Sequence, residues 1–425
     1  MPAIFIAHRV CSDPLPMAAH IMIANSSQTY VVIPLSIQPE ENGYLIGNQE
    51  LEEFYQFPEE SLPIITLLQQ GRTIAEVKAE CERAFTESVD VEDFIGTLSE
   101  IGFIFPSEQK ADFQQKLDSA PPDKRWKFAL PQKIAGAIFS APALLLYLAI
   151  LGYAALSAAS DPRLRINPHA LYIRENFTIT LLVLLLLQAL TTALHELGHM
   201  TAAAKYGIKS KLGWGNRLWS IVAEADLSGL HSLPKRQRYL PLLAGLIIDL
   251  LNIACVTLLI KLLLSRDVDP FIIQIFQALI LQILFTMSWQ FNVFLKTDIY
   301  YALCVYCNYP NLDSEARVYL RAHLHRLSGG RLGAAGPSRY YNLGTLRAFA
   351  ALWLAGRVLA LILLFVVIIP TLLRYGRDAW RVVGNSVSSS YDKWDLSLFF
   401  ILSSALLALG LYVWLKGRTR ISKGN

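Results

Sequence analysis

The chain has 425 residues, of which 53% are hydrophobic and only 17% are charged, and its formal net charge is +4 at pH 7. Soluble globular chains carry about 25% charged residues, so this composition excludes an ordinary soluble protein. The small positive charge comes from basic residues gathered in a few segments, and it requires no nucleic-acid partner.

Residues 1–105 have the composition of a small α+β domain. The stretch "YVVIPLSI" predicts a strand, and "GYLIGN" with "ELEEFYQF" predicts a hairpin that turns at Asn48-Gln49. Three short helical patterns follow, the second opened by a capping box of Thr73 and Glu76 and the third stopped by Gly102. A hairpin beside three short helices predicts a winged-helix-like domain.

Residues 106–126 are polar and contain prolines, which predicts a linker, and residues 127–425 form a membrane domain. Crossing a bilayer takes about 20 apolar residues in a helix. Six runs in this domain are long enough, and they lie at 134–157, 177–203, 240–264, 271–294, 347–370 and 397–415. The sequence therefore predicts a polytopic α-helical membrane protein with a small N-terminal α+β domain.

Lys and Arg concentrate before the first span, between spans two and three, between spans four and five, and after the last span. Because basic loops stay in the cytoplasm, this distribution predicts cytoplasmic N- and C-termini. On the cytoplasmic side, the Gly-punctuated alternation of segment 205–238 predicts one or two strands, and segment 308–345 a flexible basic loop.

The second span contains "ALHELGHMTAAAKYG", which places His195, Glu196 and His199 in an otherwise apolar run. Histidines four residues apart lie one turn apart on the same helix face and can bind one Zn²⁺ ion, with the intervening Glu as general base. The same pattern also occurs by chance on the wet surfaces of soluble helices. Ionisable groups at membrane depth are rare and functional by default, so we interpret the three residues as a metal site.

A catalytic zinc site needs a third protein ligand, and four residues on the same membrane side are candidates: Asp226, His231, Asp249 and Asp298. Asp298 follows the fourth span at its cytoplasmic end. Asp249 lies midway through the third span, which suits a hydrogen-bond partner of a ligating histidine, or a polar contact between helices, better than direct ligation.

Three ordered segments carry a resemblance to a known family: "ALHELGHMTAAAKYGIKSKLG", "DLSGLHSLPKRQRYLPLLAG" and "FNVFLKTDIYYALCVYCNYPNL". Together they resemble the site-2-protease type of intramembrane zinc metallopeptidase, and more narrowly the peptide zinc metalloproteases of bacterial peptide maturation and export. The resemblance covers residues 180–315, about half the chain. It implies His195, His199 and Asp298 as zinc ligands and Glu196 as the catalytic base.

The sequence departs from the family pattern at two positions. The family's Asp is followed by Gly, whereas Ile299 follows Asp298 here, and Val293 replaces the proline that follows the family's Asn. The departures keep a catalytically weakened relative open, as well as a non-catalytic membrane protein that binds a peptide for export or self-protection. A third alternative is a regulatory site-2 protease that releases a transcription regulator.

The expected substrate is a membrane-associated or leader-bearing peptide, or a small membrane protein, with a peptide exporter as a further partner. An intramembrane protease must unwind its substrate, and a strand edge in segment 208–227 could capture the extended form. Asn292 could hydrogen-bond the substrate backbone or the developing oxyanion. The N-terminal domain resembles PqqD-like modules, which bind leader peptides along a strand edge; a regulatory or assembly domain is the alternative.

Overall fold

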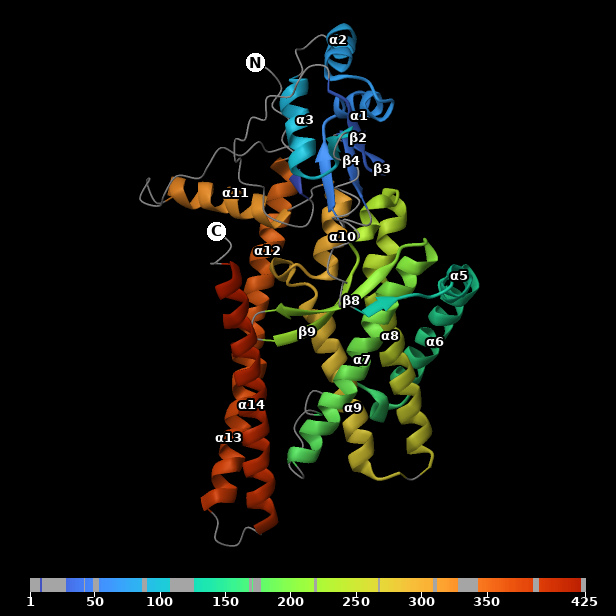
Figure 1. Cartoon of the computed structure of the whole chain (residues 1–425). Coiled ribbons are helices and arrows are strands. Elements are labelled where there is room, and N and C mark those ends of the chain that lie inside the picture. Colours follow the sequence, from blue (N-terminus) through green and yellow to red (C-terminus); the bar gives the residue numbers. More distant parts are fainter. Residues whose placement is uncertain are drawn as a thin grey trace. The chain divides into compact units, whose positions relative to one another are not determined.

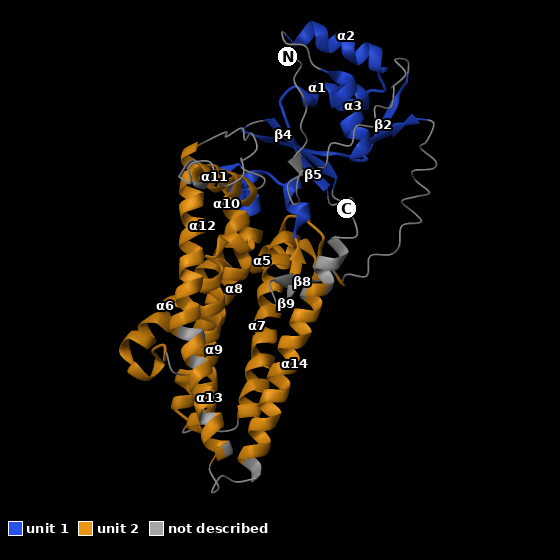
Figure 2. Ribbon diagram, turned by 90° about the vertical axis from the view of Figure 1, so that its left-hand side faces the viewer, with its two compact units in different colours: residues 1–125, 227–239, 304–312 blue, residues 126–226, 240–303, 313–425 orange. Residues whose placement is uncertain are grey.

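The computed structural model describes residues 8–9, 28–41, 43–48, 53–85, 90–107, 126–167, 170, 177–217, 220–266, 268–308, 312–327, 343–384 and 390–421 (Figure 1). The chain divides into two compact units, coloured separately in Figure 2. Unit 1 comprises residues 1–125, 227–239 and 304–312, and unit 2 comprises residues 126–226, 240–303 and 313–425.

Unit 1 contains the predicted hairpin as part of an antiparallel sheet. Strands β3 (Ser36–Glu40), β4 (Gly43–Asn48) and β5 (Glu53–Phe57) pair in that order, and β1 (His8–Arg9) pairs with the outer edge of β5. Asn48 ends β4, while the other half of the predicted turn lies outside the described residues. The hairpin itself is therefore confirmed.

The strand composition of "YVVIPLSI" is confirmed, and the stretch contributes to two separate strands. Strand β2 (Tyr30–Val32) pairs with β6 (Ile104–Pro106) in a separate two-stranded sheet, whereas β3 belongs to the hairpin sheet. Pro34 lies between β2 and β3, and a proline has no N–H to continue a ladder. Its carbonyl instead accepts a hydrogen bond of 2.7 Å from Asn48 Nδ2.

The three predicted helices are present as α1 (Ser61–Gln69), α2 (Ile74–Ala84) and α3 (Val91–Glu100). The capping box is confirmed, since Thr73 N donates to Glu76 Oε2 at 2.9 Å and Glu76 N to Thr73 Oγ1 at 3.4 Å. Gly102 follows α3 with a φ of 75°, which a side chain would disfavour. The apolar faces of these helices and sheets form one core, which includes Ile46, Tyr55, Phe57, Ile64, Leu68, Val77, Phe94, Leu98 and Phe103.

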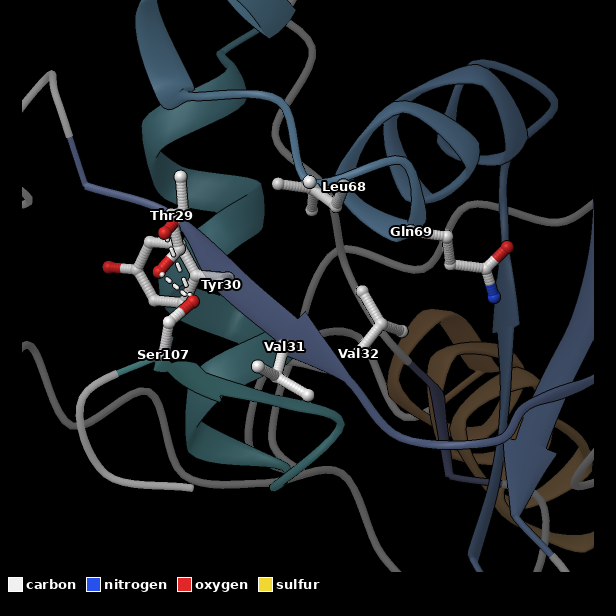
Figure 3. A pocket seen from close by; sticks show the side chains of 8 residues that line it. Thr29, Tyr30, Val31, Val32, Leu68, Gln69 and Ser107 are labelled. Carbon is white, nitrogen blue, oxygen red and sulfur yellow. Dashed lines mark hydrogen bonds between the residues drawn. The ribbon is translucent and has the colours of Figure 1, made fainter. Parts of the chain in front are cut away.

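An open pocket of about 330 Å³ lies beside β2 in unit 1 (Figure 3). Residues 29–32 line one wall, Leu68, Gln69 and Gly71 at the end of α1 line the other, and Ser107 completes it. Thr29 Oγ1 lies 3.0 Å from Ser107 Oγ, which ties the start of β2 to the end of β6.

Unit 1 also includes residues 227–239, which the sequence did not predict to belong with the N-terminal elements. This segment contains the short helix η3 (Ser228–Ser232) and the first turn of α8 (Lys235–Leu264). Gln38 Nε2 donates to Ser232 O at 2.7 Å, and Arg238 forms a buried 2.6 Å ion pair with Glu40. Burial, helped by the nearby Arg238 charge, lowers the pKa of His231 to about 3, so its imidazole is neutral.

Among the described residues, six helices that lie wholly or mostly in unit 2 are long and apolar enough to cross a membrane. The spans lie in α5 (Gln132–Ile138) with α6 (Ala141–Ser160), α7 (Phe177–Lys205), α8, α9 (Pro270–Trp289), α12 (Leu343–Leu363) and α14 (Ser390–Ile421). All six predicted spans therefore correspond to such helices.

The fifth of these helices is longer than predicted. The sequence predicted an end at residue 370, but α12 continues through a π-helical turn (Leu364–Ile368) into α13 (Ile369–Gly384). Pro370 lacks the N–H that an α-helix would use at this point, and π-turns are a common way to absorb such a defect. The segment with Arg374, Arg377 and Arg381 is thus helical.

Two further features of unit 2 differ from or extend the predictions. The loop predicted for 308–345 contains a helix, α11 (Leu312–Leu327). Buried Asp313 holds the start of this helix, because it accepts a hydrogen bond of 3.0 Å from Trp353 Nε1 on α12.

The predicted strands in segment 205–238 are β8 (Ser210–Arg217) and β9 (Ser220–Asp226). They form an antiparallel pair, which β7 (Trp126–Phe128) extends on the β8 side.

Helix α7 is anchored at its N-terminus by another helix. Phe177 N and Thr178 N donate to the carboxylate of Asp395 on α14 at 2.7 and 3.0 Å. The first N–H groups of a helix have no hydrogen-bond acceptor within the helix. Inside a membrane there is also no bulk water to accept their hydrogen bonds. Asp395 thereby fixes the helix that carries the two motif histidines.

Candidate metal centre

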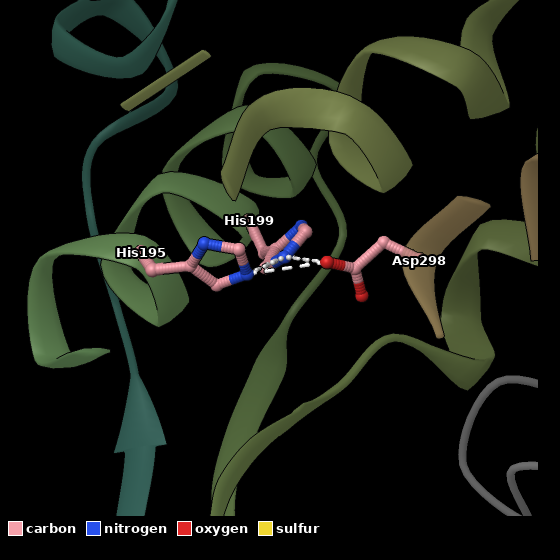
Figure 4. Close-up of side chains that lie close together, drawn as sticks. All are labelled: His195, His199 and Asp298. Carbon is pink, nitrogen blue, oxygen red and sulfur yellow. Dashed lines mark hydrogen bonds and ion pairs between the residues drawn. The ribbon is translucent and has the colours of Figure 1, made fainter. Parts of the chain in front are cut away.

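His195 and His199 lie one turn apart on α7, as their spacing predicts, and both are buried. Their Nε2 atoms approach to 3.1 Å, with the ring planes inclined at 76° (Figure 4). The two rings therefore present one nitrogen each to the same point.

Asp298 brings a carboxylate to that point from a distant part of the sequence. It is the first residue of α10 (Asp298–Cys307), and its Oδ2 lies 3.1 Å from His195 Nε2 and 3.3 Å from His199 Nε2. Ligands held about 2.05 Å from a tetrahedral zinc ion lie about 3.3 Å from one another. The three atom pairs thus have the separations of one face of a zinc tetrahedron.

The opposite nitrogens of the two rings face hydrogen-bond acceptors. His195 Nδ1 lies 2.9 Å from Asp249 Oδ2, and His199 Nδ1 lies 2.7 Å from the carbonyl oxygen of Pro241. A carbonyl can only accept, so the proton of His199 is on Nδ1 and its Nε2 presents a lone pair. His195 has a carboxylate oxygen at each ring nitrogen, and a metal at the common point requires the tautomer in which Nδ1 donates to Asp249. Without an added proton or cation the three facing atoms would repel one another, and a zinc ion between them removes that repulsion, so the residues present fit a zinc ion.

Two glycines permit the close approach of α7 and α8 around this site. A Cβ at Gly245 on α8 would collide with both imidazoles, and a Cβ at Gly198 on α7 would lie 2.7 Å from Ile248 Cγ1 and 3.2 Å from Ala244 O. Gly198 therefore lets the backbone of α8 come close to α7.

Glu196, the predicted base, contacts the sheet of unit 2. Its Oε2 accepts a hydrogen bond of 2.7 Å from Ala225 N in β9. Because β9 is the outer strand of the order β7-β8-β9, an N–H that reaches Glu196 points away from β8. Helix α7 therefore borders the outer edge of β9 at Ala225.

The remaining candidates lie in different surroundings. Asp249 contacts the far side of His195, Asp226 ends β9, and His231 lies in unit 1 with its ring 5.5 Å from that of Phe54. None of these three belongs to the His195, His199 and Asp298 group. Asn292 is fully buried, and neither of its side-chain amide atoms has a hydrogen-bond partner among the described residues.

Sequence reasoning missed four contributors to the site. These are the carbonyl of Pro241, Gly245, the N–H of Ala225, and Gln290, whose side chain contacts Asp298. Backbone groups leave no trace in residue identity, so Pro241 and Ala225 had no signal. Gly245, one helical turn before Asp249 in "LAGLIID", carried a weak one.

Comparisons of the chain with protein-family models, with curated proteins and with solved structures gave no match. The function is therefore inferred from the residues of this chain and their geometry.

Proposed function

We propose that the chain is an intramembrane zinc metalloprotease that cleaves a membrane-associated or leader-bearing peptide during peptide maturation or export. One observation carries the proposal: His195 Nε2, His199 Nε2 and Asp298 Oδ2 converge within 3.3 Å, while both Nδ1 atoms face acceptors. A three-ligand set that leaves one coordination position open is typical of catalytic rather than structural zinc.

In this proposal His195, His199 and Asp298 hold the metal, and Asp249 and Pro241 O keep the imidazoles in the ligating tautomer. When bound, zinc acts as a Lewis acid and makes hydroxide available at neutral pH. Glu196 accepts the proton released from the attacking water. Its Oε2 already accepts the Ala225 N–H, so we assign the proton to Oε1.

The substrate in this proposal binds along β9. A peptide bond inside a helix is shielded, whereas an extended segment can add to the outer edge of a strand through main-chain hydrogen bonds, here at positions of β9 other than Ala225, whose N–H binds Glu196. Asn292 supplies a second contact, because a buried amide without a partner costs about 1–3 kcal/mol. A substrate carbonyl or developing oxyanion that reached this amide would recover that cost.

Unit 1 has the role of recognising the substrate's leader in this scheme, as a winged-helix-like, PqqD-like module. The open pocket beside β2 supports this role, since it combines the partly buried side chains of Val31 and Val32 with the main chain of a strand that, among the described residues, pairs only with β6. From the distribution of Lys and Arg we infer that both termini are cytoplasmic, and the proposed function assigns the spans to a bacterial inner membrane. A peptide exporter is the expected partner.

Two other functions remain for the same geometry. A non-catalytic peptide-binding protein for export or self-protection has no need of Glu196, yet this carboxylate is held by a strand edge next to the two histidines. A regulatory site-2 protease would use the same chemistry on a different substrate. The experiment below separates the first alternative from the proposal by chemistry and the second by substrate.

The test is Glu196→Gln, which keeps an acceptor for the Ala225 N–H but removes the base. Loss of a positioned general base lowers the rate by about 10²–10⁴. Cells whose only copy carries E196Q should accumulate an uncut precursor, found by mass spectrometry of membrane-fraction peptides against wild-type cells. The purified variant should keep its zinc, because Glu196 is not a ligand in this scheme.

Asp298→Ala provides the matched control, since it should lose both zinc and processing. Normal processing by E196Q would overturn the hydrolytic mechanism and favour the peptide-binding alternative. Accumulation of a transcription regulator's membrane anchor, in place of a small peptide precursor, would favour the regulatory protease.

A further inference from the structure

Gln290 is a buried polar residue to which neither the sequence motifs nor the proposed chemistry gives a role. It follows directly after α9, eight residues before Asp298, and only 7% of its surface is exposed. A buried amide in an apolar helix bundle costs free energy unless its donors and acceptor are satisfied. Its partners therefore indicate what it does.

Both ends of the Gln290 side chain bind the same residue. Nε2 donates to Asp298 Oδ2 at 2.9 Å, and Oε1 accepts from Asp298 N at 3.1 Å. The main-chain carbonyl of Gln290 also accepts a hydrogen bond of 2.6 Å from Thr297 Oγ1. Gln290 thus fixes the backbone of Asp298 and the direction of its carboxylate at once.

The carboxylate oxygen that Gln290 holds is the one that faces the histidines. Asp298 Oδ2 is the atom 3.1 and 3.3 Å from the two Nε2 atoms. A carboxylate oxygen has more than one lone pair, so it can accept the amide N–H and still bind a cation. Without the amide, the Asp298 side chain is free to rotate away from the imidazoles. Metal binding would then have to order it, and this entropy cost would lower the metal affinity.

The backbone before Asp298 needs such a support. Lys296 has φ 55° and ψ 52°, a left-handed conformation that is unfavourable for a residue with a side chain. This bend follows the short helix η4 (Val293–Leu295) and returns the chain to Gln290. Ile299 is helical within α10. The chain therefore bends before Asp298, at Lys296, and not after it, where the family pattern has a Gly.

We propose that Gln290 is a positioning residue of the metal centre, which orients the Asp298 carboxylate toward His195 and His199. The inference rests on the proposed function, because it assigns to Gln290 the outer contact of a metal ligand. Loss of such contacts lowers metal affinity about 10–100-fold in other metalloproteins.

The experiment compares two variants that each break one part of this arrangement. Gln290→Met keeps the length and burial of the side chain but removes both hydrogen bonds to Asp298. Thr297→Val keeps the shape of Thr but removes the hydrogen bond that ties the loop to the Gln290 carbonyl. Zinc and cobalt affinities of the purified full chain are measured by competition with a chelator, together with the visible spectrum of the cobalt form.

We expect Gln290→Met to lower the affinity about 10–100-fold and to change the cobalt spectrum. Thr297→Val should lower the thermal unfolding temperature of the metal-free protein. Its zinc affinity should stay within about threefold of the wild type, since Asp298 keeps its hydrogen bonds to the Gln290 amide. Gln290→Asn is the second variant, in case Gln290→Met does not fold. It retains a buried amide that is one methylene too short, and it should lose affinity as well.

Equal affinity of wild type and Gln290→Met, or Gln290→Asn where it replaces that variant, would overturn the inference and leave the proposed function intact. An equal loss in Gln290→Met and Thr297→Val would also overturn it, because the loop and not the amide would then be responsible. A wild-type chain that binds neither zinc nor cobalt would overturn the proposed function and this inference with it.

Discussion

Gly245 shows how a single missing Cβ shapes the candidate metal centre. The residue lies on α8, where an added Cβ would collide with the rings of His195 and His199. The conflict involves imidazoles that Asp249 and Pro241 hold from behind, so the rings cannot simply rotate away. The geometry at this position therefore requires glycine.

Gly245→Ala should abolish zinc binding, because the methyl group pushes the two Nε2 atoms off their common point. Zinc per chain after purification is the measurement, with circular dichroism as the check on folding. Gly152→Ala on α6 is the matched control, since a Cβ there meets nothing within 4 Å. A Gly245→Ala chain that kept a full zinc complement would show that the site can expand. The inference that this position requires glycine would then be wrong.

Residue identity alone predicted part of this centre. The i, i+4 spacing fixes His195 and His199 on one face because helix geometry is local. The contact between His195 and Asp249 required a second helix at a particular depth and rotation. From the sequence, Asp249 could be a metal ligand, a hydrogen-bond partner of a ligating histidine, or a packing contact between helices. The clamp of Gln290 on Asp298 requires a left-handed residue in between, which neither side chain encodes.

At the scale of elements, the buried ion pair in unit 1 joins β3 to the first turn of α8. Arg238 also donates to the carbonyls of Leu233 and His231, at 2.7 and 3.4 Å, so its guanidinium is held by three acceptors. Glu41 forms a similar-looking pair with Lys235 at 3.8 Å, but that pair is largely exposed. The neighbouring residues Glu40 and Glu41 at the end of β3 therefore form one buried and one exposed ion pair.

Glu40→Ala should destabilise segment 227–239, because it leaves the Arg238 charge buried without a counter-ion. Breaking a buried pair in this way costs about 3–5 kcal/mol, while an exposed pair contributes about 0–1 kcal/mol. Hydrogen exchange of the backbone amides of 227–239 in the detergent-solubilised full chain measures the effect. Equal exchange in Glu40→Ala and Glu41→Ala would show that the ion pair does not hold this segment.

The elements themselves were predicted to different extents. Thr73, Glu76 and Gly102 were recognised as helix signals because caps depend on residues within one turn. The extension of the fifth apolar helix beyond residue 370 to Gly384 was missed, as was helix α11. The charged residues of α11 resemble those of a loop, and its helical state depends on Asp313 meeting Trp353 on another element.

At the scale of the whole molecule, the six apolar helices define a multi-pass membrane protein. The orientation that we infer follows from the positions of Lys and Arg. A reporter that is active only outside the cytoplasm should be silent when fused after residue 425 and active when inserted near Asp269, between α8 and α9. Activity at the C-terminus and silence at Asp269 would reverse the topology and place the candidate metal centre on the other side of the membrane.

The sequence by itself determined the class of protein, the number of spans and the pair of histidines, because hydropathy and helical spacing act over one turn or one span. It also singled out Asp298, through motif order and not through geometry. Only the tertiary structure brought Asp298 Oδ2 to the imidazoles, chose Pro241 O and Asp249 as their outer partners, and required Gly245 between them. It also joined residues 227–239 to the N-terminal elements. These contacts join residues 42 to 198 positions apart, and helix packing within each unit decides which of them form.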